Sequence, residues 1–166
     1  SPFPILTYGW IQFVKAEAAF KKGDMNTART AYIEGINGSF DLLTSNNYTG
    51  YTPITTTARN DYVNHWLVTP NAAELSLSHI MLQKFVSLWP YGMEEVWVDL
   101  RKYQYSPNIF IGHVPVSPLH ANNGGKLVQR VRPRYNSEYL WNVAELQKIG
   151  AIALDYHTVP VWFSKP

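Results

Sequence analysis

Acidic side chains are the first candidates for chemistry, because two carboxylates on either side of a glycosidic bond can hydrolyse it. Glu95 and Asp99 lie one helical turn apart in a predicted helix, but on a mostly solvated side of it. Glu17 falls on the apolar face of another predicted helix, where a buried carboxylate needs a partner, and Arg101 is the candidate. We therefore interpret these carboxylates as structural and predict no catalytic residue.

Other chemical motifs are missing from the sequence. The five histidines form no H-x-x-x-H pair, and the chain has no cysteine, so nothing indicates a metal site or a disulfide. No phosphate-binding loop, dinucleotide fingerprint or nucleophile elbow occurs, and we predict no cofactor. A formal net charge of +2 is too small to drive non-specific nucleic-acid binding.

Three arginines alternate along an extended segment, Arg130, Arg132 and Arg134. Alternation places them on one side of an extended chain. Their guanidinium groups supply many fixed donors, suited to holding an irregular segment through carboxylates and helix-end carbonyls. We predict that at least two of them bond within the protein and join the loop-rich end to the helical body.

Aromatic residues make up 14 % of the chain, while charged residues make up only 16 %. Aromatic faces suit both a packed core and a carbohydrate platform, because a sugar ring lies flat on them. The most attractive exposed aromatics lie among Asn and Thr residues that can bond sugar hydroxyls. These candidate ligand-binding residues are Tyr48, Tyr51, Tyr62 and Trp66.

The N-terminal region predicts an antiparallel helical hairpin over residues 1–43. Helices are expected from Pro4 to Lys22 and from Asp24 to about Leu43, with Gly23 between them and Asp24 as N-cap. The spacing of Ala16, Ala28 and Tyr32 matches a tetratricopeptide unit. A lone repeat cannot bury its own face, so we expect further repeats upstream.

The rest of the chain is predicted to contain a variable polar loop over 44–70, a helical pair over 71–103 and a loop-rich region over 104–166. The loop carries a short helix near Ala58 to Trp66. The first helix of the pair has Asn71 and Glu74 in capping-box spacing, and its partner runs from Met93 to about Tyr103. The apolar face of the first helix is expected to contain Leu75, Leu82, Phe85, Val86 and Trp89. A terminal helix is expected over roughly Ser137 to Gly150, which makes the fold mainly α.

Three segments resemble the C-terminal portion of the SusD/RagB family of nutrient-uptake lipoproteins from Bacteroidetes. The first is the hairpin, "ILTYGWIQFVKAEAAFKKGDMNTARTAYIEGI". The second is "MEEVWVDLRKYQY", in which Glu95, Trp97, Asp99, Leu100 and Arg101 match an E-x-W-x-D-L-R pattern. The third is "RVRPRYNSEYLWN" with the closing "TVPVWFSKP". Where many members have Tyr-Pro this chain has Tyr135-Asn136, which indicates a divergent branch.

The resemblance implies a non-enzymatic protein on the exterior face of the outer membrane, held by an N-terminal lipid. It would act with a SusC-like TonB-dependent transporter and bind an oligosaccharide or, as in the RagB branch, a peptide. Because the chain opens on Ser1 and lacks a lipidation cysteine, we expect it to be a piece of a larger protein. Trp97 and Asp99 are expected to be structural.

Two other functions are compatible with the residues. A helical-repeat scaffold would bind another protein through the concave face of its hairpins, although it would not need the irregular region after Gln104. A helical carbohydrate-active enzyme would need acids that converge in a pocket.

Overall fold

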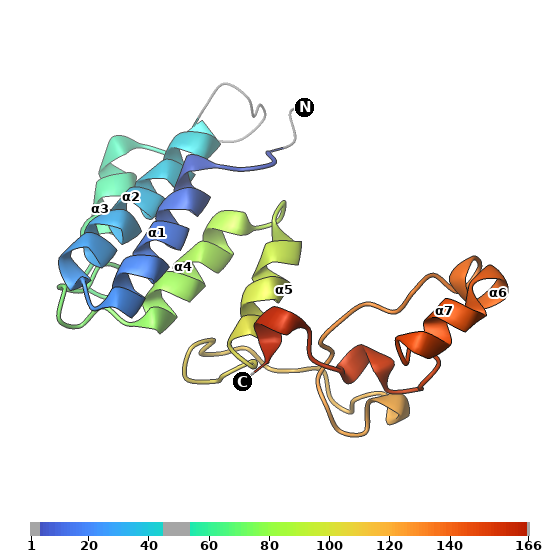
Figure 1. The fold of residues 1–166 in the computed structure, drawn as a ribbon. Coiled ribbons are helices and arrows are strands. Elements are labelled where there is room, and N and C mark those ends of the chain that lie inside the picture. The colour runs from blue at the N-terminus through green and yellow to red at the C-terminus, as the bar shows by residue number, and fades with distance from the viewer. Residues whose placement is uncertain (1–3, 45–53, 166) are drawn as a thin grey trace. The chain divides into compact units, whose positions relative to one another are not determined.

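The computed structural model describes residues 4–44 and 54–165 of the chain, which forms two compact units. The N-terminal unit contains residues 1–100 and 106–111, and the C-terminal unit contains 101–105 and 112–166. The described residues are largely helical and contain no β-strand (Figure 1). The predicted mainly α fold is confirmed, with a helical hairpin, further helices and a loop-rich C-terminal region.

The hairpin consists of α1 (Tyr8–Lys22) and α2 (Met25–Thr44). Helix α1 begins after Thr7, whose side chain accepts a hydrogen bond from the backbone N–H of Trp10 at 3.2 Å. It ends at Gly23, whose φ of 79° lies in the left-handed region that glycine adopts most easily. Asp24 then caps α2 by accepting from the N–H of Thr27 at 3.0 Å, as the sequence predicts.

Small residues let the two hairpin helices approach closely. Ala16, Ala28 and Tyr32 are buried between elements of the unit, which agrees with their tetratricopeptide-like spacing. Sequence spacing alone does not predict the part played by glycine. A Cβ atom on Gly38 would lie 2.9 Å from the backbone nitrogen of Gly9, a separation that real Cβ atoms essentially never show. The helix backbones therefore touch where these two glycines meet.

Three further helices complete the N-terminal unit, α3 (Thr56–Asn64), α4 (Leu77–Leu88) and α5 (Met93–Lys102), although the last two residues of α5 belong to the C-terminal unit. The predicted capping box of α4 at Asn71 and Glu74 is wrong. Asn71 instead caps a turn, accepting from the N–H of Ala73 and Glu74 at 3.0 and 3.1 Å. The helix starts later, where Ser76 and His79 form the reciprocal capping bonds.

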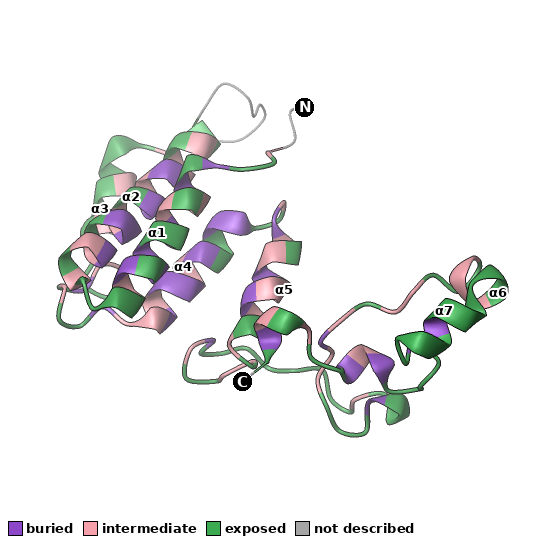
Figure 2. Cartoon of the chain, viewed as in Figure 1, coloured by how far each residue is buried: buried purple, intermediate pink, exposed green. Residues whose placement is uncertain are grey.

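The predicted apolar face of α4 is wrong in part: Leu75 is buried but precedes the helix, and Leu82 is half-buried. Phe85, Val86 and Trp89 are exposed, and the helix buries a face formed by Ser78, Ile80, Met81, Lys84, Ser87 and Leu88 (Figure 2). The reason is Lys84, which is buried because Asp99 on α5 neutralises it. A prediction based on hydrophobicity places such a lysine in solvent. It therefore assigns the buried face to the wrong side of the helix.

The C-terminal unit has little regular structure. It contains α6 (Glu138–Trp141) and α7 (Val143–Lys148), with 3₁₀ turns at Ala121–Asn123, Tyr156–Thr158 and Trp162–Ser164. The single terminal helix predicted over this region is broken at Asn142, whose φ of −130° lies outside the helical range. Leu146, Ala151 and Tyr156 form a small core, covered in part by Tyr139.

Candidate functional site

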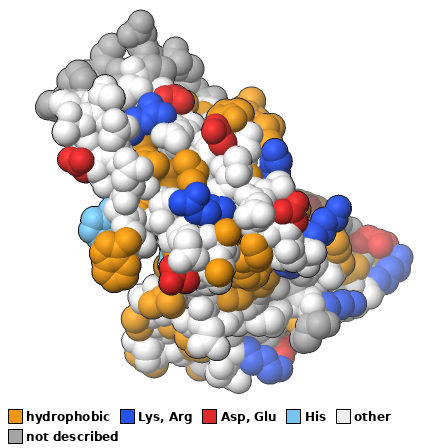
Figure 3. All heavy atoms as spheres, turned by 90° about the vertical axis from the view of Figure 1, so that its left-hand side faces the viewer, with side chains coloured by type: hydrophobic (Ala, Val, Ile, Leu, Met, Phe, Trp, Pro, Cys, Tyr) orange, Lys and Arg blue, Asp and Glu red, His pale blue; other side chains and the backbone are white. Residues whose placement is uncertain are grey.

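Trp66 stands out among the predicted ligand-binding aromatics, because its side chain is 72 % exposed. It follows the end of α3, and its ring lies nearly parallel to that of His65, with 6.2 Å between the centroids. Asn64 and His65 beside it are also exposed. On the face of the molecule shown in Figure 3, hydrophobic side chains gather in patches between charged ones. Tyr48 and Tyr51 lie outside the described residues.

Tyr62 has a different environment from Trp66, although the sequence predicts a ligand-binding role for both. It lies on α3 and is half-buried, with its ring edge-to-face against Phe40 at 5.6 Å. The side-chain amide of Gln83 on α4 donates to its hydroxyl at 2.8 Å. Tyr62 therefore packs between helices and forms one wall of a hollow, which Trp66 does not line.

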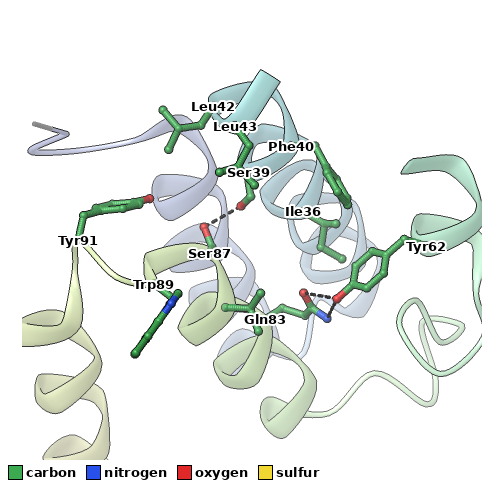
Figure 4. A pocket seen from close by; sticks show the side chains of 11 residues that line it. Ile36, Ser39, Phe40, Leu42, Leu43, Tyr62, Gln83, Ser87, Trp89 and Tyr91 are labelled. Carbon is green, nitrogen blue, oxygen red and sulfur yellow. Dashed lines mark hydrogen bonds between the residues drawn. The ribbon is translucent and has the colours of Figure 1, made fainter. Parts of the chain in front are cut away.

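This hollow, the apolar hollow hereafter, lies in the N-terminal unit and has a volume of about 290 Å³. Tyr62 and Phe40 flank one end, while Trp89 and Tyr91 flank the other (Figure 4). The described residues that line it are Ile36, Ser39, Phe40, Leu42, Leu43, Tyr62, Gln83, Val86, Ser87, Trp89 and Tyr91. Sequence reasoning missed it because α2, α3, α4 and the following turn contribute residues that no local spacing connects.

Several polar groups of the apolar hollow are already hydrogen-bonded within the protein. The hydroxyl of Ser39 lies 2.7 Å from that of Ser87 and 2.9 Å from the carbonyl oxygen of Gly35. Gln83 and Tyr62 form the other polar pair. Among the described residues, no charged side chain lines the hollow. The surface presented to a ligand is therefore neutral and made mostly of carbon.

The predicted structural carboxylates are buried. Asp99 is paired with Lys84, with 2.7 Å between Oδ2 and Nζ. Glu17 is buried on α1, as predicted, with Lys21 Nζ 4.0 Å from its Oε1. The pairing of Glu17 with Arg101 stays a prediction. Trp97, between Glu95 and Asp99 in the E-x-W-x-D-L-R pattern, is half-buried.

The arginines of the C-terminal unit hold its loops together. Arg130 donates from Nε to the carbonyl of Val159 at 2.8 Å and from Nη2 to that of Pro160 at 2.6 Å. Arg132 donates to five groups, namely the carbonyls of Leu154, Ala151 and Ala153, the hydroxyl of Tyr139 and Nδ1 of His157. The prediction that at least two of the three arginines bond within the protein is confirmed, while Arg134 is exposed.

These bonds correct the predicted partners. Arg130 and Arg132 bond mainly to loop carbonyls of their own unit, whereas the sequence predicts carboxylates, helix ends and a join to the helical body. Arg101 joins the same unit, since its Nη1 donates to the carbonyl of Gln129 at 2.9 Å and its guanidinium lies 5.0 Å from the ring of Phe163. The arrangement stabilises an irregular region by fixed donors rather than by a large core.

A second hollow, in the C-terminal unit, is lined by polar side chains that are largely used in internal bonds. It includes Arg130, Arg132, Asn123 and His157. Because a guanidinium can only donate, Nδ1 of His157 accepts from Arg132, and its Nε2–H donates to Asn123 Oδ1 at 2.8 Å. Arg132, Asn123 and His157 are thus engaged in bonds within the protein.

In residues 4–44 and 54–165, no group of three His, Cys, Asp or Glu side chains could hold a metal ion. None of the helices described is long and apolar enough to cross a bilayer.

Comparison with known proteins gives one family. Residues 1–133 match the family model SusD-like, described as starch-binding and associating with the outer membrane. The match includes the hairpin and the E-x-W-x-D-L-R helix, and it ends within the arginine segment. No curated protein and no solved structure matches the chain. Because the match covers four fifths of its residues, the chain belongs to the SusD-like family of starch-binding proteins that associate with the outer membrane.

Proposed function

We propose that this chain is part of a non-catalytic lipoprotein that binds an oligosaccharide at the exterior face of the outer membrane. The observation that carries the proposal is the family match over residues 1–133. The protein would deliver its ligand to a SusC-like TonB-dependent transporter and would be held to the membrane by an N-terminal lipid. A peptide ligand, as in the RagB branch, is the competing ligand class.

Trp66 is the residue that we assign to sugar binding. Its indole is the most exposed of the described candidates, and the exposed Asn64 and His65 beside it can bond hydroxyl groups. A sugar ring placed on the indole would bury apolar C–H groups while its hydroxyls stay at the edge. Tyr62 stabilises the position of α3, which precedes Trp66, because its hydroxyl accepts a hydrogen bond from Gln83 on α4.

Calorimetric titration of the full-length protein with maltooligosaccharides and a wider glycan panel tests the proposal. We expect saturable binding, and Trp66→Ala should weaken it about tenfold through the lost stacking surface. Trp141→Ala is the matched control, because Trp141 is 86 % exposed and lies in the C-terminal unit. Equal weakening of glycan binding by both variants would show that Trp66 is not part of the binding site.

The same samples separate the alternatives. Chromatography of the glycans after incubation should recover them unchanged, and shorter products would indicate an enzyme. Binding of peptides but no glycan would support the RagB-like ligand class, and binding of neither would leave the helical-repeat scaffold. Co-purification of a TonB-dependent transporter with the full-length protein from outer membranes tests the partner.

A further inference from the structure

The apolar hollow is poorly suited to a bare sugar. Most of its hydroxyl and amide groups are already bonded, Ser39 with Ser87 and Gln83 with Tyr62, and the Tyr91 hydroxyl lies 3.4 Å from that of Thr7. A sugar hydroxyl placed there would lose its water partners and find few replacements, which is costly in an apolar environment. The lining thus disfavours the ligand class that we assign to Trp66.

A neutral aromatic group fits the same lining. The described lining has no charged side chain, and aromatic rings stand at both ends, Phe40 and Tyr62 opposite Trp89 and Tyr91 (Figure 4). Rings placed between such walls can adopt edge-to-face or offset contacts. A volume of about 290 Å³ is close to the lower limit for small-molecule pockets, which suits one or two rings.

We propose that the apolar hollow binds a small neutral aromatic group, at a site separate from Trp66. The group has two possible sources. It is either a free aromatic molecule or an aryl substituent carried by a glycan. The proposal does not depend on sugar binding at Trp66, since Trp66 does not line the hollow.

Fluorescence titration of the full-length protein with the neutral probe N-phenyl-1-naphthylamine tests the site. Val86 lines the hollow with 58 % of its surface exposed, so Val86→Asp introduces a charge without disturbing the core. We expect this variant to weaken probe binding at least about tenfold, because a carboxylate is strongly disfavoured against a bound apolar group. Val14→Asp is the control, since Val14 is 47 % exposed on α1 and does not line the hollow.

A second variant, Val86→Trp, keeps the site apolar and fills it, so it should also reduce probe binding even if Val86→Asp fails to fold. Absence of saturable probe binding, or equal affinity in wild type and both Val86 variants, would overturn the proposal. Displacement by methyl maltoside would overturn it as well, because that sugar has no aromatic group.

Competition identifies the source of the aromatic group. Phenyl maltoside and 4-methylphenol should both displace the probe. If phenyl maltoside competes more strongly, the group belongs to a glycan, and if the two compete equally, it is a free molecule. Trp66→Ala leaves probe binding unchanged under this proposal, so failure of the glycan site and failure of the aromatic site give different results.

Discussion

Lys84 on α4 and Asp99 on α5 form a buried ion pair, with Nζ 2.7 Å from Oδ2 and side chains only 5 % and 9 % exposed. Each charge loses most of its water in this position and depends on its partner for compensation. Asp99 belongs to the E-x-W-x-D-L-R pattern by which the sequence resembles its family. The pair therefore links this family pattern to the packing of the N-terminal unit.

Lys84→Met should destabilise the protein by about 3–5 kcal/mol, because it leaves the Asp99 carboxylate buried without its lysine. The double variant Lys84→Met, Asp99→Leu should recover most of that loss, since two apolar side chains replace two desolvated charges. Urea unfolding measures both. Lys22→Met, at the exposed end of α1, serves as the control, and a double variant no more stable than the single one would contradict the pairing argument.

Gly38→Ala should destabilise the hairpin by about 1–3 kcal/mol through overpacking. Intrinsic helix preference favours alanine over glycine by about 1 kcal/mol, so the prediction has the opposite sign to propensity. The added Cβ would lie 2.7 Å from the ring of Tyr8 and 2.9 Å from the backbone of Gly9. Thermal unfolding checks the sign, and a rise in Tm would show that the two helices can separate without cost.

The contribution of Asp24 to the stability of the protein should depend on pH. The pKa of the Asp24 carboxyl is held below its ordinary value of 3.8 by hydrogen bonds from Thr27. The bond from the side chain has the larger effect and the bond from the backbone the smaller one. A carboxylate with a lowered folded pKa stabilises the protein above its unfolded pKa, and this contribution is lost as the pH falls through the folded value.

The difference in Tm between wild type and Asp24→Ala should therefore be present at pH 7 and shrink as the pH falls below about 4. Asp24→Asn keeps an acceptor for the N–H of Thr27. It should restore most of the stability at pH 7, with no comparable dependence on acid. A Tm difference for Asp24→Ala that is constant from pH 7 to pH 3 would exclude the carboxylate as its cause.

Arg132→Met should destabilise the C-terminal unit by more than about 2 kcal/mol, because several carbonyls lose a charged donor at once. Hydrogen exchange measures this locally, and protection of the Gln129 and Arg130 amides, which donate to the carbonyl of His157, should fall. Arg134→Met is the matched control from the same alternating segment. Similar loss of protection in both variants would mean that the hydrogen bonds of Arg132 do not account for the stability of this segment.

The helical hairpin was predictable from sequence because its signals are local. Gly23 and Asp24 act within one turn of the chain, and the spacing of Ala16, Ala28 and Tyr32 follows from the helical period alone. The internal bonding of Arg130 and Arg132 was predictable for a similar reason, since a loop-rich segment with fixed donors needs acceptors nearby.

The buried face of α4 and the apolar hollow depended on tertiary structure. Hydrophobicity places Lys84 in solvent, and only Asp99 from another helix makes its burial favourable. The hollow combines Phe40, Tyr62 and Trp89 from separate elements. Sequence determined what each segment forms by itself, through caps and periodicity, whereas the folded chain decided which charges cancel and which rings meet, because those interactions join residues far apart in sequence.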